Sequence, residues 1–165
     1  MSGYEWDAAP AAGSAPAAGT AGNDFLAGFT DGPGSHDAAQ KMKNAGNTLK
    51  TLAQNGSFAV NEAGFNAYMK ACDFFMHGYN RMIRELGVLS LPAGMGNFDY
   101  GVAVANFNVQ VASVGGDAML PNLVLMRDAV DAAQQALAIA RKNYQETEHA
   151  HSVSFAELNK KIDGK

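Results

Sequence analysis

The chain has 165 residues, a length that suits one domain with tails. Its formal net charge is −4, and residues 1–34 carry all of it, because they contain four acidic side chains and no Lys or Arg. The remaining residues balance 12 acidic against 12 basic side chains without clustering the bases, which excludes the positive surface that nucleic acids and anionic membranes require.

Residues 1–34 are expected to form a flexible acidic tail, because residues 8–22 are a low-complexity run of Ala, Gly, Pro and Ser with little to bury. Large apolar side chains flank this run on both sides. Those that follow it are expected to pack back onto the helices, and a docking motif for a partner is the alternative. The flanking side chains are Tyr4, Trp6, Phe25, Leu26 and Phe29.

The helical domain is expected to cover residues 35–152. Its first helix should run from Ser35, a favourable N-cap residue, to about Gln54, although Gly46 in its interior lowers the helix propensity. After an Asn-Gly turn, Asn61 is expected to cap a second helix with a much stronger apolar pattern.

Apolar residues of this second helix recur every three or four positions, which is the heptad spacing of a helix that packs along a neighbour. Three more apolar residues widen the stripe, so more than one neighbour is expected. Cys72 lies on the stripe and is the only cysteine, which excludes an intrachain disulfide and favours a buried small hydrophobe. The seam is Phe65, Met69, Cys72, Met76, Tyr79, Ile83 and Leu86, and the widening residues are Tyr68, Phe75 and Met82.

Residues 87–101 contain Pro92 and four glycines, so the helix should end there and the chain should turn. Residues 102–114 fit both a strand and a helical face. A helix is favoured, because no second strand exists to satisfy the backbone of an isolated one. Two glycines follow, and Asp117 is expected to cap the final helix.

The final helix carries a second heptad seam, and two such seams joined by a Gly-rich connection predict an all-α fold, either an antiparallel helical hairpin or a small helical bundle. Residues 153–165 are expected to add a short C-terminal helix or a tail. The second seam is Leu123, Met126, Val130, Ala133, Leu137, Ala140 and Tyr144.

Patterns that carry enzyme chemistry are missing from the sequence. It has no Gly-rich phosphate loop and no nucleophile elbow. The segment ETEHAH at 146–151 has the Glu-x-x-His spacing of di-iron bundles, but such a site needs the motif on two helices. We therefore expect a non-enzymatic protein without metal or cofactor. The N-terminus lacks the features of a cleaved signal peptide, and no apolar run is long enough to span a membrane.

Tyr144 and Glu148 are four residues apart, so a helix places the phenol and the carboxylate on one face, where a partner can bind both. The spacing alone is common in helices. Because Tyr144 also continues the second seam, core packing is the simpler interpretation of that residue.

The order of segments resembles a known class of exported proteins. A seam helix follows NGSFAVNEAGF, a turn reads GNFDYG, and a long helix ends in ARKNYQETE. Over about residues 57–152 this resembles the type VII (ESX) secretion substrates of actinobacteria, the WXG, Esp and PE/PPE-like proteins built on a helical hairpin with a Tyr-x-x-x-Asp/Glu signal after it. The smaller members carry Trp-x-Gly in the turn, whereas the only tryptophan here is Trp6, which leaves the subfamily open.

The resemblance implies that Tyr144 and Glu148 are read by the secretion ATPase and its machinery. It also implies secretion to the outside or the cell surface without a cleaved signal peptide, and action by association with a helical partner or a second copy. The two seams are expected to bury each other, and the face of Tyr68, Phe75 and Met82 is expected to meet the N-terminal helix or a partner. The alternative is an intracellular scaffold, or a toxin-neutralising or chaperone-like bundle, that is not exported.

Overall fold

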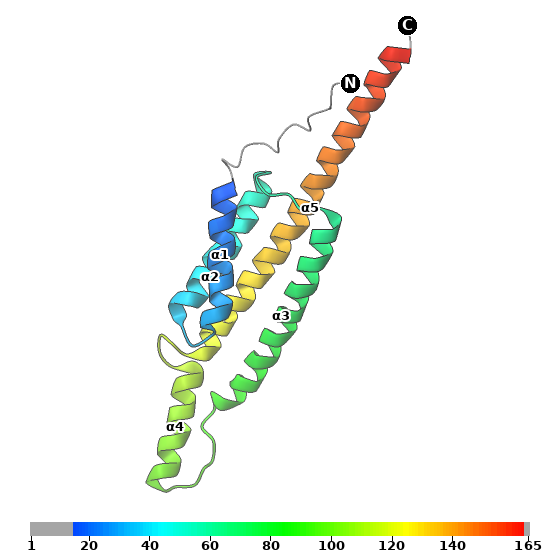
Figure 1. Ribbon diagram of the computed structural model, residues 1–165. Coiled ribbons are helices and arrows are strands. Elements are labelled where there is room, and N and C mark those ends of the chain that lie inside the picture. Colours follow the sequence, from blue (N-terminus) through cyan, green and yellow to red (C-terminus); the bar gives the residue numbers. More distant parts are fainter. Residues whose placement is uncertain (1–14, 164–165) are drawn as a thin grey trace.

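The computed structural model describes residues 15–163, apart from the side chains of 15–20, 155–159 and 161–163. This part of the chain contains five α-helices and no strand, which confirms the all-helical prediction for these residues. The helices are α1 (Ala15–Asp31), α2 (His36–Gln54), α3 (Glu62–Leu89), α4 (Asp99–Ser113) and α5 (Met119–Asp163), as Figure 1 shows.

The longest helix, α5, is the axis on which the others are arranged: α2 and α3 pack along it, and α1 packs on α2 (Figure 1). Helix α2 runs parallel to α5, because its contacts advance in the same direction along both helices. His36 Nδ1 lies 3.0 Å from Asn122 Oδ1 at one end, and Asn143 Nδ2 donates to the Ala53 carbonyl at 2.7 Å near the other.

Helix α3 runs antiparallel to α5. Near its start, Glu62 Oε1 accepts from Arg141 Nη2 at 2.9 Å, and one third of the way along, Asp73 Oδ1 accepts from Gln134 Nε2 at 2.8 Å. The α3 contacts thus move backward along α5 as the chain advances. Helix α5 therefore has a parallel neighbour on one side and an antiparallel neighbour on the other.

One face of α5 supplies the centre of the core. The first six residues of its seam are buried, and Leu123 and Val130 are fully buried. The seam of α3 and its widening residues Phe75 and Met82 pack against this core from the other side, together with Met42 of α2. The buried seam residues of α5 are Leu123, Met126, Val130, Ala133, Leu137 and Ala140.

Gly46 of α2 lies where α2 comes closest to α5. A Cβ atom added to Gly46 would be 2.6 Å from the carbonyl oxygen of Ala129, which is closer than real Cβ atoms approach backbone. The residue that lowers the helix propensity of α2 is therefore the one that allows its close approach to the central helix.

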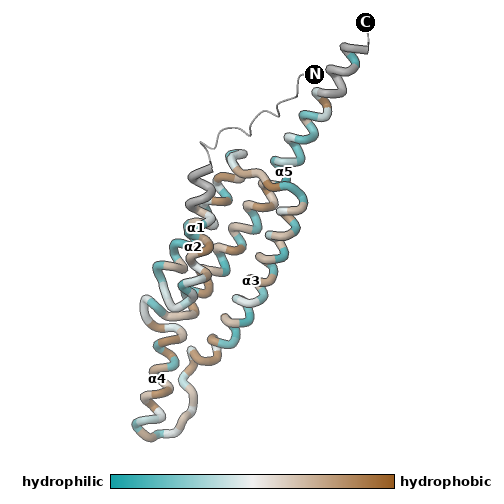
Figure 2. The backbone as a smooth tube through the Cα atoms, viewed as in Figure 1, coloured by the Kyte–Doolittle hydropathy of each residue, from teal (hydrophilic) through white to brown (hydrophobic). Residues whose placement is uncertain are grey.

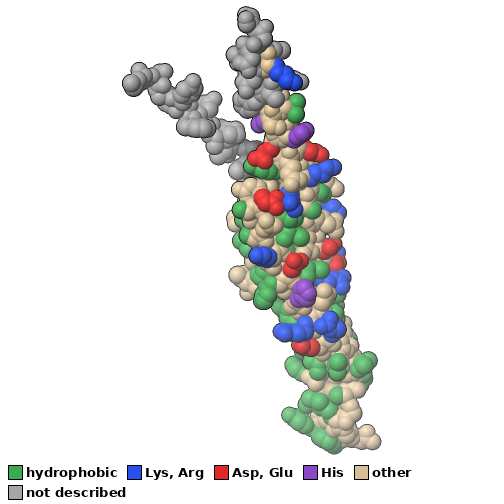
Figure 3. All heavy atoms as spheres, turned by 90° about the vertical axis from the view of Figure 1, so that its right-hand side faces the viewer, with side chains coloured by type: hydrophobic (Ala, Val, Ile, Leu, Met, Phe, Trp, Pro, Cys, Tyr) green, Lys and Arg blue, Asp and Glu red, His purple; other side chains and the backbone are tan. Residues whose placement is uncertain are grey.

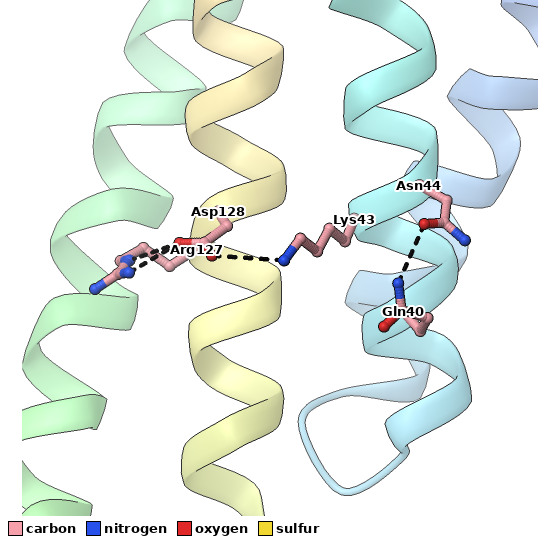
Figure 4. A network of polar contacts seen from close by, with 5 residues as sticks. All are labelled: Gln40, Lys43, Asn44, Arg127 and Asp128. Carbon is pink, nitrogen blue, oxygen red and sulfur yellow. Dashed lines mark hydrogen bonds and ion pairs between the residues drawn. The ribbon is translucent and has the colours of Figure 1, made fainter.

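One ion pair joins α2 to α5 at the surface, and a second lies beside it within α5. Lys43 Nζ of α2 is 3.9 Å from Asp128 Oδ2 of α5, and Arg127 Nη2 donates to Asp128 Oδ1 at 2.8 Å (Figure 4). Exposed pairs of this kind stabilise a fold by about 0–1 kcal/mol each. The apolar core, and not these pairs, holds α2 in place.

The expectation of a flexible tail over residues 1–34 is wrong from Ala15 onward, because the chain forms α1 there. Alanine favours helix, and Phe25 and Phe29 lie one turn apart on the same face. Their ring centroids are 5.5 Å apart, and Phe29 lies 4.2 Å from Phe75 of α3. Burial of these rings against the core stabilises the helix over residues 15–31. Two aromatic residues of the expected tail lie outside the described residues: Tyr4 and Trp6.

The predicted N-caps of α2 and α3 are confirmed, because Ser35 accepts from the Ala38 backbone N–H and Asn61 accepts from that of Gly64. The predicted cap of the final helix is wrong. Helix α5 begins at Met119, and the Asp117 carboxylate instead accepts from the backbone N–H of His36, at 3.4 Å.

The end of the chain also differs from the expectation of a separate short segment over residues 153–165. Helix α5 is continuous from Met119 to Asp163 and is about 67 Å long at a rise of about 1.5 Å per residue. No Gly or Pro interrupts it after Pro121, so nothing in the sequence breaks the helix.

Candidate functional site

Helix α5 leaves the body of the bundle at Asn143. The side chain of Asn143 donates to the Ala53 carbonyl at the end of α2, at 2.7 Å. The same carbonyl accepts from the Gly56 backbone N–H at 3.1 Å, so Asn143 adds a second hydrogen bond to the end of α2. Every residue over 145–154 is exposed. The last part of α5 therefore projects beyond the body (Figure 1).

Arg141 fixes α5 to α3 just before this point. Its Nη2 donates to Glu62 Oε1 at 2.9 Å, and its guanidinium carbon lies 4.6 Å from the centre of the Phe65 ring. An arginine that stacks on a ring and pairs with a carboxylate is well held. Arg141 is thus committed to the body of the bundle and sets the direction in which α5 emerges.

Tyr144 and Glu148 contact one another across one turn of α5, directly after these anchors. Tyr144 Oη donates to Glu148 Oε1 at 2.6 Å, which is the length of a charge-assisted O–H···O hydrogen bond. Glu148 is exposed, Tyr144 is partly exposed, and neither belongs to the core. The α5 seam therefore leaves the core after Ala140, and core packing does not account for Tyr144.

The hydrogen bond from Tyr144 to Glu148 raises the pKa of the phenol, and the negative charge of the carboxylate raises it further. We predict that Glu148→Ala lowers the pKa of Tyr144 back towards the ordinary tyrosine value, because both effects are removed. The pH dependence of the Tyr144 Cζ carbon chemical shift measures this. Glu146→Ala is the control, since Glu146 pairs with Lys142 at 3.6 Å; an equal fall in both variants would contradict the pairing.

The remaining polar groups over residues 145–154 are exposed and include His149 and His151 of the ETEHAH segment. Within the residues that the structure describes, no group of three or more His, Cys, Asp or Glu side chains is arranged to hold a metal ion. What the projecting helix offers is an aromatic ring beside a carboxylate, an arrangement suited to binding by a partner.

The residues predicted to form the helix-packing interface fall into three groups. Tyr68 differs from the prediction, because it is 59% exposed at the mouth of a cavity. Partly buried residues packed against the core are Phe65, Met69, Phe75, Met76 and Ile83. Buried residues are Cys72, Tyr79, Leu123, Met126, Val130 and Leu137.

An apolar cavity of about 390 Å³ lies between α1, α3 and α5, lined by residues that include Phe25, Cys72, Phe75 and Leu137. Burial raises the pKa of the Cys72 thiol, and the neighbouring Asp73 charge raises it further. Cys72 is therefore the buried, unreactive hydrophobe that its place on the seam indicates.

Sequence reasoning did not identify Asn122, which is fully buried at the start of α5. Its Nδ2 donates to the carbonyl of Pro33 at 3.0 Å, and its Oδ1 faces His36 Nδ1. Asn122 thus joins the turn between α1 and α2 to the central helix. Its neighbours in sequence give no sign of this role, because its partners are about 90 residues away.

Comparison with protein-family models, with curated proteins and with solved structures gave no match for this chain. None of the helices over residues 15–163 combines the length and the apolar character needed to cross a membrane.

Proposed function

We propose that this protein is a non-enzymatic helical protein exported by a type VII secretion system, with Tyr144 and Glu148 as the pair that the secretion machinery recognises. The observation that supports this most is the 2.6 Å hydrogen bond between the two side chains, on the part of α5 that projects beyond its last contacts with the body. In this proposal, the antiparallel pair of α3 and α5 is the hairpin that substrates of this kind share.

Recognition would need no unfolding of the bundle. The side chains of Arg141 and Asn143 hold α5 against the body, so the helix that follows is presented in one direction. The hydrogen bond limits the rotamers of Tyr144 and Glu148, which reduces the side-chain entropy that a partner must remove on binding. A partner surface fits this pair if it is apolar where it meets the Tyr144 ring and carries a basic group for the second carboxylate oxygen of Glu148.

The proposal predicts that Glu148→Ala abolishes most of the export while leaving the fold intact, because Glu148 is exposed and outside the core. Loss of hydrogen bonds to a charged group weakens binding by about 1.5–3 kcal/mol, so export should fall roughly tenfold or more. The measurement is the amount of protein in the culture supernatant of a host with an active type VII system, with circular dichroism of the purified variant as the check on folding.

Glu146→Ala is the matched control, since it removes an exposed acid two residues away from Glu148 on the same helix. Its export should equal that of the wild type. Tyr144→Phe keeps the ring but removes the donor, so it separates recognition of the ring from recognition of the hydrogen-bonded pair. Equal export of the Glu148→Ala and Glu146→Ala variants would contradict the assigned pair.

A further inference from the structure

The end of the molecule opposite the projecting part of α5 is an exposed apolar surface, which we call the α4 tip and define as residues 88–114 (Figure 1). Ten of the fourteen large hydrophobic side chains that are exposed in the described residues lie in it, so exposure is concentrated and not scattered. Surfaces of this kind mark binding sites in soluble proteins. The ten are Val88, Leu89, Leu91, Met95, Phe98, Tyr100, Val102, Phe107, Val111 and Val114.

Charge is almost missing from the α4 tip. Asp99 is the only charged residue between Leu86 and Gly116. Helix α4 is brown over most of its length in Figure 2, and the face of the tip in Figure 3 shows hydrophobic side chains without Lys or Arg. A helix that lies in a membrane interface needs a polar face rich in Lys or Arg, which α4 lacks. The composition favours an uncharged apolar protein surface as the occupant.

The exposed side chains of α4 are spaced for packing against another helix. Phe107 and Val111 are four residues apart, and Tyr100 lies one heptad before Phe107. We call these three residues the α4 stripe. This is the seam spacing by which helices pack side by side. The residues that α4 buries against its own chain are small: Gly101, Ala105 and Ala112.

We propose that two copies of this chain associate through their α4 tips, with the α4 stripe of one copy packed against the α4 stripe of the other about a two-fold axis. A two-fold interface requires a self-complementary surface, and a nearly uncharged apolar stripe meets that condition without repulsion between like charges. The ten exposed side chains together present roughly 1,000 Å² of accessible surface per copy. A standard stable interface buries about 800 Å² per partner, so the interface takes in most of the α4 tip around the stripe.

This association leaves the proposed recognition pair free. The projecting part of α5, which carries Tyr144 and Glu148, lies at the other end of the molecule from α4 (Figure 1), so each copy in the dimer would present its own pair at an outer end. The tip association rests on α4 alone and does not depend on the proposed export. Its test uses purified protein, whereas export is tested in cells, so failure of one is distinguishable from failure of the other.

The test is the mass of the full chain in solution by sedimentation equilibrium. The wild type is expected to have twice the chain mass of 17.3 kDa, with little change between low and high salt. Val111→Asp and Phe107→Asp place a charge in the α4 stripe and should each weaken dimerisation at least tenfold. Because both side chains are exposed, circular dichroism should show an unchanged helix content.

Val153→Asp is the matched control, because Val153 is also an exposed valine on a helix but lies outside the α4 tip. It should remain a dimer. A wild-type chain that is monomeric at about 100 μM, a hundredfold above a micromolar Kd, would overturn the proposal. So would equal dissociation of the Val111→Asp and Val153→Asp variants, or binding of a monomeric wild type to phosphatidylcholine vesicles, which would make lipid the occupant.

Discussion

Met126→Ala is expected to lower the free energy of unfolding by about 2–5 kcal/mol, the range for removing a large buried side chain and leaving a cavity. Met126 is 1% exposed and is the second residue of the α5 seam, within the core shared by α2, α3 and α5. Domains of this size are stable by about 5–15 kcal/mol, so this single change removes a large share of the total.

Urea unfolding followed by circular dichroism measures this loss. Met76→Ala is the matched comparison, because Met76 occupies the corresponding seam on α3 but is only partly buried. Met76→Ala should lower the free energy of unfolding by less than Met126→Ala does. Equal losses in the two variants would mean that α5 is not the centre of the core.

Gly46→Ala has the second large expected effect, and its cause is the backbone of the neighbouring helix. The new Cβ atom would lie 2.6 Å from the Ala129 carbonyl oxygen, which no side-chain rotation relieves. Helices α2 and α5 would have to move apart along their contact, so we expect a loss of about 1–3 kcal/mol, as for other overpacked sites.

Gly78→Ala, at a glycine inside α3, is the comparison in which we expect the stability to rise. A Cβ atom there meets nothing within 4 Å. Alanine should therefore raise the stability by about 0.4–1 kcal/mol, since it reduces the entropy of the unfolded chain without a clash. Thermal unfolding of the Gly46→Ala and Gly78→Ala variants measures both changes in stability. Stabilisation by Gly46→Ala would show that α2 and α5 are not in close contact.

Much of the fold follows from local patterns. Heptad spacing identifies α3 and α5, and Ser35 and Asn61 mark the starts of α2 and α3 by the hydrogen bonds that their side chains accept. The helix over α4 follows from the lack of a strand partner. These features are predictable because each is decided by residues within a few turns of one another.

The errors come from contacts between distant segments. Residues 15–31 have the composition of a linker, and the contacts of α1 with α2 and of Phe29 with Phe75 of α3 offset the entropy cost of forming a helix there. The sequence indicates Asp117 as the cap of the helix that follows it, whereas its carboxylate accepts from the backbone N–H of His36. The sequence alone indicates only that Gly46 lowers the helix propensity of α2. Its place in the contact with α5 is visible only in the structure.

The candidate site was predictable in position but not in geometry. The spacing of Tyr144 and Glu148 places them on one face, but the sequence continues the heptad seam through Tyr144 as if it were core. In the structure, the buried part of the seam ends at Ala140, and the Tyr144 hydroxyl donates a hydrogen bond to Glu148. Tyr144 therefore belongs to the candidate site and not to the core. The α4 stripe shows the same limit: its spacing resembles a buried seam, and only the fold shows that its side chains are exposed.

The central claim is export by a type VII system, and the most direct measurement is the amount of wild-type chain in culture supernatant from two hosts. One host has an active system, and the other is the same strain without its secretion ATPase. We expect the chain in the supernatant of the first host, and in the second only inside the cells. Equal amounts in both supernatants, or none in either while the active host releases a known substrate, would contradict the account.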